Sequence, residues 1–271
     1  MAAENAAVGD ERADRAPGGG QRAGRVVLVG GGPGDPGLMT VAGLDAVRTA
    51  DVVVTDRLGP VSILDDLDPG IEVISVGKVP FGPATPQEEI NRILVEQARR
   101  GRTVVRLKGG DSFLFGRGAE EHLACTAAGV PVTVIPGVTS ALSVPALAGV
   151  PATHRGLSQG VSVISGHVPP GDPQSTLDYG ALARSGTTLV LLMAVTTLPA
   201  ITAELLAEGM PADTPAVLIE NGSTPAERVV SGTLATIAQQ AAEAGVAPPA
   251  ITVIGAVAGL AGELAPGRPP R

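Results

Sequence analysis

Short apolar runs alternate with amphipathic stretches over most of the chain, and this alternation predicts an α/β fold. The runs are rich in valine, leucine and isoleucine and are bounded by glycine, proline or aspartate, as expected of buried strands. Between them, apolar residues recur every three or four positions, which is the spacing of one helix face. In the first half we predict strands at 25–29, 51–55, 71–76, 104–108 and 132–135, and helices at 40–49, at 139–148 and ending at 129.

The strongest helix signal lies in residues 85–101. Thr85 is the predicted N-cap, Pro86 takes the first helical position, and Glu88 completes a capping box. Gly101 ends the helix. Its buried stripe is predicted to be Ile90, Ile93, Leu94 and Ala98.

A break in the alternation at 151–156 predicts a linker between two α/β domains, at 25–150 and 157–264. The first sheet is expected to be mainly parallel and the second mixed. Residues 1–24 lack apolar periodicity and are expected to be a disordered tail, and 265–271 a loose tail. In the second domain we predict strands at 161–164, 188–193, 216–219, 227–231 and 250–254, and helices near 199–208 and 233–244.

Composition narrows the class of protein. The net charge of −8 opposes a broad nucleic-acid surface, and an aromatic content of 1% opposes base stacking. The single cysteine, Cys125, cannot form an internal disulfide. No apolar run reaches the length of a membrane span, so we expect a soluble, cytoplasmic protein. His122, His154 and His167 lack metal-ligand spacing, and we expect no metal.

The strand at 104–108 leads into a turn formed by Gly109, Gly110 and Asp111. Glycines permit a close backbone approach or a positive φ, and the carboxylate can accept a hydrogen bond from a hydroxyl or amine. Ligands of α/β sheets lie beyond the carboxyl ends of strands, where this turn falls. Taken alone, the stretch is more typical of an ordinary glycine turn than of a ligand site.

A second glycine loop, at 32–37, matches G-x-G-x-x-G after a strand, and Asp56 ends the next strand. This is the outline of a dinucleotide site. However, a pyrophosphate needs backbone N–H donors, and Pro33 and Pro36 remove two of them. We therefore predict a loop that walls a site for a ligand without phosphates.

Several segments, in order along the chain, resemble the uroporphyrinogen-III C-methyltransferases. The resemblance extends from about residue 26 to 260 and is strongest before 167. The matching segments are 29–36 with Leu38 and Thr40, 50–53 with Asp56, Arg57 and Leu58, Gly77 and Lys78, Gln87 with 89–91, 109–121, 136–141, and 153–155. The chain departs from the family pattern at Thr55, Val79 and Leu192, where the family usually has tyrosine, arginine and an aromatic residue.

The resemblance implies a class III methyltransferase of the tetrapyrrole methylase fold. In this fold two α/β domains enclose an active site in the cleft between them, usually in a homodimer. The implied reaction is two transfers from S-adenosylmethionine to C2 and C7 of uroporphyrinogen III. It gives precorrin-2, the branch point to sirohaem and cobalamin, and S-adenosylhomocysteine.

The resemblance also implies roles for individual residues. Asp56 is the implied proton acceptor and Lys78 the implied proton donor. The implied cofactor site comprises Pro33, Gly109, Gly110, Asp111, Leu114, Thr139, Ser140, Met193 and Gly222. Because the substrate is rich in carboxylates and the protein is acidic, the site must be locally positive. The candidate cations are Arg57, Lys78, Arg106, Lys108, Arg117, His154 and Arg155.

Each role has an alternative. Asp56 either stabilises the cationic methylated ring or takes its proton, or it is an ion-pair partner or turn cap beside Arg57. Lys78 either donates a proton or binds a substrate carboxylate, since an unperturbed lysine is a poor acid at neutral pH. Alternative functions are methylation of a later corrin intermediate, an NAD(P)-dependent oxidoreductase, and a non-catalytic scaffold. We expect the single-function form, because the length leaves no room for a fused ferrochelatase or dehydrogenase module.

Overall fold

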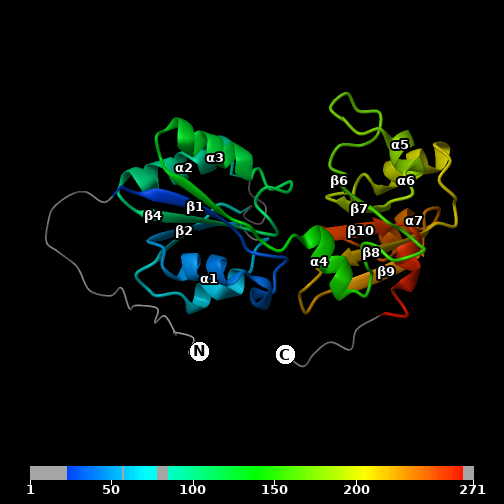
Figure 1. Cartoon of the computed structure of the whole chain (residues 1–271), viewed down its shortest axis with the longest axis horizontal. Coiled ribbons are helices and arrows are strands. Elements are labelled where there is room, and N and C mark those ends of the chain that lie inside the picture. Colours follow the sequence, from blue (N-terminus) through cyan, green and yellow to red (C-terminus); the bar gives the residue numbers. More distant parts are fainter. Residues whose placement is uncertain (1–22, 57, 78–84, 265–271) are drawn as a thin grey trace, which may run out of the picture.

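The computed structural model describes residues 23–56, 58–77 and 85–264, and within them the strands form two sheets of five strands each (Figure 1). Arg57, Lys78, Val79 and most of the two predicted tails lie outside the described residues. The predicted α/β architecture is confirmed. Of the helices within the described ranges, none combines the length and apolarity needed to cross a membrane.

The first sheet is parallel throughout and runs in the order β3-β2-β4-β1-β5. Its strands are β1 (Arg25–Gly30), β2 (Val52–Thr55), β3 (Glu72–Ser75), β4 (Thr103–Lys108) and β5 (Val132–Ile135). The chain leaves β1 toward β2 but leaves β4 toward β5, in the opposite direction. The carboxyl ends of the neighbouring strands β1 and β4 therefore mark the switch point, where ligands bind in open α/β sheets.

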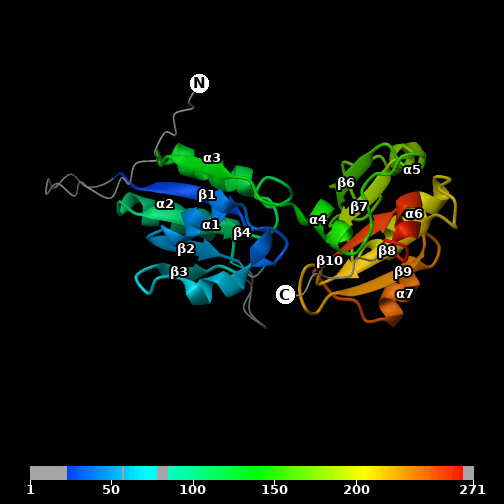
Figure 2. The same ribbon diagram turned by 60° about the horizontal axis from the view of Figure 1, so that its bottom comes forward.

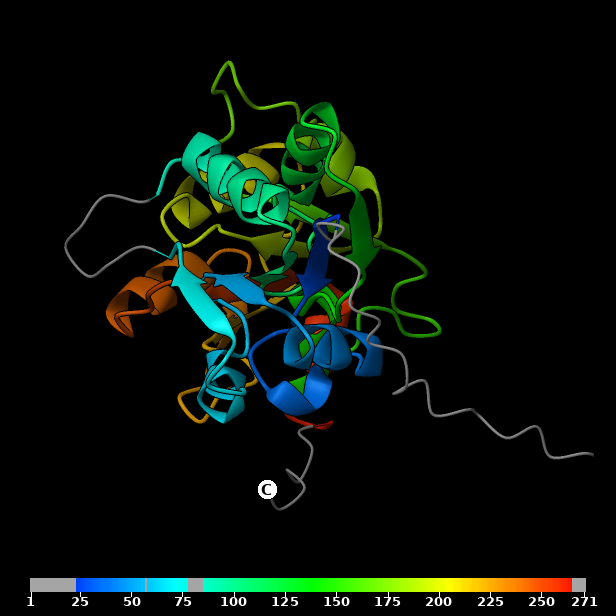
Figure 3. The ribbon, with the colours of Figure 1, turned by 90° about the vertical axis from the view of Figure 1, so that its left-hand side faces the viewer.

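Helices cover both faces of this sheet, as Figure 3 shows for α1 and α2. One face packs against α2 (Gln87–Arg99) and α3 (Gly118–Ala127), and the other against α1 (Val41–Arg48) and the short η2 (Val61–Asp66). Side chains alternate between the faces along each strand, so Val104 lies on the α2 side and Val105 on the α1 side.

The start of α2 corrects one prediction. The helix begins at Gln87, and its N-cap is Pro86, whose extended backbone makes no side-chain cap bond. The predicted capping box of Thr85 and Glu88 is wrong, because Pro86 stands before the helix rather than in its first turn. The predicted end is confirmed: Gly101 has a φ of +80°, and its N–H donates to the Ala98 carbonyl over 2.9 Å.

The second sheet is mixed, as predicted, in the order β6-β7-β10-β8-β9. Only β6 and β7 are parallel among its neighbouring strands in the described chain. The sheet comprises β6 (Val161–Ser165), β7 (Thr188–Leu192), β8 (Pro215–Glu220), β9 (Arg228–Thr233) and β10 (Ala250–Ile254). One face packs against α5 (Tyr179–Arg184), α6 (Leu198–Ala207) and α7 (Ile237–Glu243). The sequence analysis missed α5, which is too short to show a helical period.

The opposite face of the second sheet is covered by α4 (Ser140–Leu147) and the short η3 (Ala256–Leu260). Ala141 and Val144 of α4 pack with Val190, Val217 and Val253 of this sheet. In Figures 1 and 2, α4 lies between the two sheets. By sequence α4 falls within the predicted first domain, but it packs on the second sheet. The domain limits 25–150 and 157–264 stay a prediction.

The single cysteine is expected to report on folding. Cys125 of α3 is buried, and burial together with the charge of Glu121 raises the pKa of its thiol to about 11. Since the thiolate is the reacting species, the folded protein at pH 8 should react with a disulfide reagent on the order of 100-fold more slowly than the denatured chain. Absorbance after mixing checks this, and equal rates in the two states would contradict it.

Candidate active site

Three loops at the carboxyl edge of the first sheet are bonded to one another. They follow β1, β4 and β5. Gly31 donates its N–H to the Lys108 carbonyl over 2.7 Å, and Gly32 and Gly110 exchange backbone bonds of 3.1 and 2.7 Å. This bridge lies at the switch point between β1 and β4, so both glycine loops singled out in the sequence meet there.

The glycines are required mainly because the loops touch. A Cβ at Gly137 would lie 2.3 Å from the Gly110 carbonyl oxygen, and one at Gly30 would lie 2.5 Å from the Gly137 nitrogen. A Cβ at Gly109 would lie 2.5 Å from the Leu58 carbonyl oxygen, so the chain's own backbone occupies that space. Gly30 and Gly137 lie in segments that resemble the family, but the sequence analysis assigned them no role. The signal for Gly137 was the Pro-Gly turn directly after an apolar strand.

Gly110 differs from its neighbours, because it has a φ of +64° and room beside it. A Cβ there would meet the nitrogen and Oγ of Ser140 at ordinary contact distances of 3.6 Å. Gly110 thus lies against the start of α4, whose N-cap Thr139 accepts the Ala141 N–H over 3.3 Å. The structure brings these three predicted cofactor residues together.

Asp111 ties two of the loops. Its Oδ1 accepts the N–H of Phe113 and its Oδ2 accepts the N–H of Gly137, each over 2.9 Å. A carboxylate oxygen has two lone pairs, so each oxygen can accept a further hydrogen bond. Asp111 is therefore a loop anchor at the site, a role the sequence did not indicate.

Loops of the second sheet join this edge. The Asp35 N–H donates to the Ser223 Oγ over 3.0 Å, across 188 positions of sequence. Leu114 packs against the apolar cluster that α4 forms with the second sheet, as does Leu192 at the end of β7. Positive φ values in non-glycine residues gather in the loops after β4, β7 and β8, at Phe115, Arg117, Met193, Asn221 and Ser223. Such strained backbone is typical of ligand sites.

Gly222 is fixed by this junction. A Cβ there would lie 2.2 Å from Cγ1 of Val144, so Gly222→Ala is expected to push α4 away and to destabilise the fold by about 1–3 kcal/mol. Val144→Ala in the same chain should restore part of the loss. Gly262→Ala is the control, because its methyl group meets nothing within 4 Å. Thermal unfolding measures the effect, and equal midpoints for Gly222→Ala and Gly262→Ala would contradict it.

Most N–H groups of the first glycine loop already have acceptors within the protein, which leaves few donors for a pyrophosphate. The N–H groups of Gly37, Leu38 and Met39 donate to Asp35 Oδ1, Asp35 O and Pro36 O over 2.9, 3.0 and 3.1 Å. Those of Gly32 and Asp35 are committed to Gly110 and Ser223, as described above. This supports the prediction of a loop for a ligand without phosphates.

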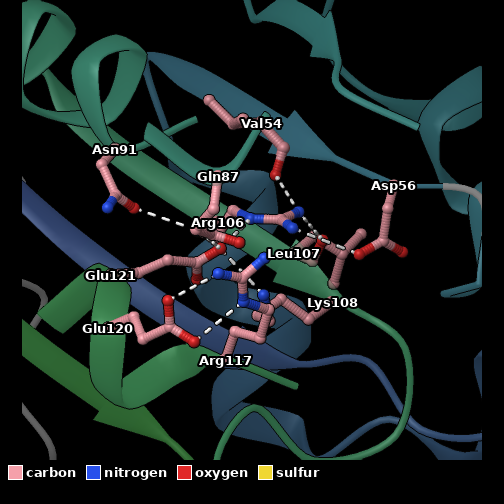
Figure 4. A network of polar contacts seen from close by, with 10 residues as sticks. All are labelled: Val54, Asp56, Gln87, Asn91, Arg106, Leu107, Lys108, Arg117, Glu120 and Glu121. Carbon is pink, nitrogen blue, oxygen red and sulfur yellow. Dashed lines mark hydrogen bonds and ion pairs between the residues drawn. The ribbon is translucent and has the colours of Figure 1, made fainter. Parts of the chain in front are cut away.

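Four charged side chains form a network under the β2 and β4 ends of the edge (Figure 4). Glu121 of α3 is fully buried, and its Oε1 accepts hydrogen bonds from Arg106 Nε at 3.1 Å and Lys108 Nζ at 2.8 Å. Arg106 also donates to Asp56 Oδ2 over 3.2 Å. Gln87 donates to the same Glu121 oxygen over 3.3 Å. Burial and the nearby Arg106 charge lower the pKa of the Lys108 ammonium.

The network corrects the prediction for Lys108. We expected its ammonium to face the substrate, but it is buried and paired with Glu121 because residues 104, 106 and 108 share the face of β4 toward α2 and α3. The same prediction was wrong for Arg106, which is buried on this face and pairs with Glu121 and Asp56. Asp56 is 22% exposed, and its Oδ1 accepts the Leu58 N–H over 3.0 Å. Asp56 thus caps this turn and forms an ion pair with Arg106, and its catalytic role stays a prediction.

Three other predicted cations lie on the surface. Arg117 is exposed and pairs with Glu120 over 2.7 Å. His154 and Arg155 are exposed in the connection between α4 and β6, where the His154 backbone pairs with Ser158. Arg117 ends the loop after β4, but no side-chain hydrogen bond or ion pair in the described part of the chain joins these three residues to the glycine turns. Met193, after β7, is 47% exposed.

A separate surface hollow lies away from these loops. A cavity of about 570 Å³ runs along the outer face of α2 and is lined by Glu88, Arg92, Glu96 and Arg99 among others. These charges mainly pair along the helix, as Arg92 does with Glu89 and Glu96. The hollow is therefore a solvated helix surface, and the loop junction is the better candidate site.

Comparison with known proteins identifies the family of the chain. The chain matches the model of the tetrapyrrole (corrin/porphyrin) methylases over residues 25–238. It is 46% identical over 237 residues to an S-adenosyl-L-methionine-dependent uroporphyrinogen III methyltransferase of Methanosarcina barkeri, covering 88% of this chain and 93% of that protein. It is also 46% identical to siroheme synthase 2 of Klebsiella pneumoniae, covering 89% of this chain and 52% of that protein. The chain thus spans about half the length of the siroheme synthases it matches.

Solved structures give the same result. A uroporphyrin-III C-methyltransferase of Thermus thermophilus complexed with S-adenosylhomocysteine is 42% identical, with a TM-score of 0.73, and the match covers 86% of this chain and 98% of that one. A cobalt precorrin-4 methyltransferase is 26% identical, with a TM-score of 0.77, covering 86% and 95%. The resemblance seen in the sequence is confirmed, and the chain belongs to the tetrapyrrole (corrin/porphyrin) methylase family.

Proposed function

We propose that this protein transfers methyl groups from S-adenosylmethionine to C2 and C7 of uroporphyrinogen III, which gives precorrin-2 for sirohaem or cobalamin. One observation carries the proposal. Residues implied as cofactor ligands, from Pro33 to Gly222, lie on loops that hydrogen bonds and packing join at one switch point. Relatives covered over almost their whole length are methyltransferases of this kind.

The residues present suit a nucleoside that carries methionine and no phosphate. Gly110 leaves space beside Ser140 at the start of α4, and Thr139 and Ser140 supply hydroxyls. Leu114 and the exposed Met193 supply apolar surface for the uncharged parts. When bound, the cofactor supplies a methyl group activated by a cationic sulfonium.

The protein's own contribution is alignment and charge. Holding a methyl donor and an electron-rich pyrrole carbon in line can supply roughly 7–11 kcal/mol of the barrier. Attack leaves a cationic ring that must lose a proton. Asp56, partly exposed at the end of β2, either stabilises that cation or accepts the proton. Lys78 as proton donor and Arg57 as a substrate ligand complete the proposal, although both lie outside the described residues.

Carboxylates of the substrate would be bound by exposed cations, for which we propose Arg117, His154 and Arg155. The proposal includes a homodimer in the cytoplasm, as the family resemblance implies. A dinucleotide oxidoreductase is disfavoured, because most donors of the first glycine loop are already used and Asp56 pairs with Arg106 rather than facing a free ribose site.

The test is a product assay with uroporphyrinogen III and S-adenosylmethionine carrying a ¹³C-methyl group. Mass spectrometry should show two added methyl groups, and carbon NMR should place them on C2 and C7. A protein that binds S-adenosylhomocysteine but leaves uroporphyrinogen III unmethylated would instead act on another tetrapyrrole. This alternative is considered because a cobalt precorrin-4 methyltransferase shares the fold.

A further inference from the structure

Arg106 reaches from the interior of the first half to the edge of the candidate site. Its side chain is 3% exposed. Nε donates to Glu121, Nη1 donates to the carbonyls of Leu107 at 2.9 Å and Val54 at 3.4 Å, and Nη2 donates to Asp56. A planar guanidinium held at this many points is fixed in both position and orientation.

The network contains two cations and two carboxylates, and it lies on a sheet face that is otherwise apolar. Arg106 and Lys108 face Glu121 and Asp56 on a sheet surface otherwise lined by residues such as Leu28 and Val104. Burying ionic groups in an apolar layer is costly, and well-packed apolar residues are often as stable or more so. Where a sequence breaks such a rule, a functional reason is expected.

Asp56 is the member of the network that reaches solvent. Arg106 holds its Oδ2, and the Leu58 N–H holds its Oδ1, so the carboxylate is oriented before any substrate arrives. Lys108 keeps Glu121 neutralised, while Glu121 anchors the Nε side of Arg106. Groups fixed in advance of the reaction stabilise developing charge at no reorganisation cost.

We propose that Arg106 is a positioning residue, backed by Glu121 and Lys108, that fixes the orientation and negative charge of the Asp56 carboxylate during methyl transfer. The inference rests on the proposed function, because it assigns Arg106 to the reaction through Asp56. It gives the buried network a purpose beyond stability.

The test is a double-mutant cycle on methyl transfer, using Arg106→Gln, Asp56→Asn and the double variant. Arg106→Gln should lower kcat by about 100-fold, as expected when a reacting group is misplaced by an ångström or so. S-adenosylhomocysteine affinity should stay within about twofold of wild type. In the Asp56→Asn background, Arg106→Gln should cost no further kcat, because its target is already gone. An equal loss in both backgrounds would overturn the proposal.

Two controls separate positioning from folding. Arg102→Gln removes an exposed arginine near the opposite end of β4, paired with Glu72, and should leave kcat unchanged. Arg106→Lys keeps the positive charge but removes the planar guanidinium, which can bond several acceptors at once. It should recover part of kcat, and it replaces Arg106→Gln in the cycle if the glutamine variant unfolds. If a folded Arg106→Lys variant recovers no kcat and its Asp56 carboxylate has not moved, Arg106 contributes to packing and does not position Asp56.

A crystal structure of the Arg106 variant is the readout that needs no substrate. The Asp56 carboxylate should adopt a different side-chain rotamer from wild type, and an unmoved Asp56 would overturn the inference. If wild type itself fails to methylate uroporphyrinogen III, the proposed function is wrong. The rotamer comparison still decides whether Arg106 positions Asp56.

Discussion

Asp56→Asn is expected to lower kcat for methylation of uroporphyrinogen III by about 10²–10⁴-fold, the usual contribution of an acid–base group. The substitution keeps the size of the side chain and removes its negative charge. An amide neither stabilises a cationic ring as well as a carboxylate nor accepts its proton. Because Asp56 contacts Arg106 and the Leu58 backbone rather than the cofactor loops, S-adenosylhomocysteine affinity should stay within about twofold.

Initial rates under saturating cofactor and calorimetric titration of S-adenosylhomocysteine measure the two quantities separately. Asp66→Asn is the matched control, because Asp66 is exposed at the end of η2, away from the network. If cofactor affinity falls as far as kcat does, Asp56 has a structural role, and the reaction depends on another residue.

Glu121→Gln is expected to reduce the free energy of unfolding by about 3–5 kcal/mol, the usual cost of removing one partner of a buried ionic group. Glu121 is fully buried and accepts hydrogen bonds from two cations through one oxygen. Its other oxygen, Oε2, has no hydrogen-bond partner among the described residues. Without the carboxylate, Arg106 and Lys108 share only the partly exposed Asp56.

Urea unfolding measures this effect. Glu120→Gln is the neighbouring control, since Glu120 is exposed and pairs with Arg117, and its effect should be far smaller. Adding Lys108→Met to Glu121→Gln removes the second buried cation and should restore part of the lost stability. Equal unfolding midpoints for Glu120→Gln and Glu121→Gln would show that the network contributes little to folding.

Local patterns in the sequence predicted most of the fold. Apolar runs marked the strands because a strand buried on both faces has no polar side to show. The stripe with Ile90 and Leu94 marked α2 because burial follows the helical period. The start of the same helix was predicted wrongly, since Thr85 and Glu88 fit a capping pattern that Pro86 displaces. Whether a capping box forms at a helix start thus depends on the backbone conformation of one residue, here Pro86.

The sequence predicted which residues form the candidate site but not the contacts between them. The two glycine loops and Asp111 were found because they directly follow apolar strands, where ligands of α/β sheets bind. Their mutual bonding, and the bond from Asp35 to Ser223, join positions that are far apart in sequence. A single sequence carries no signal for such pairs.

The sequence analysis did not predict that the Lys108 side chain faces the interior, for a different reason. At the carboxyl end of a strand, a lysine is equally suited to a ligand and to a buried partner. The choice depends on Glu121, which α3 delivers from 13 positions further along the chain. Strand alternation did offer a signal, because Val104, Arg106 and Lys108 must share one face. An acid on the covering helix would then have been the partner to seek.

Calorimetric titration of S-adenosylhomocysteine, side by side with NAD, tests the central claim most directly. The claim is that the joined glycine loops hold a nucleoside without phosphates. The account predicts saturable binding of S-adenosylhomocysteine and no measurable heat from NAD. It also predicts that Gly222→Ala, which disturbs the junction at Val144, weakens the binding while Gly262→Ala does not. Saturable binding of NAD with none of S-adenosylhomocysteine would contradict the account.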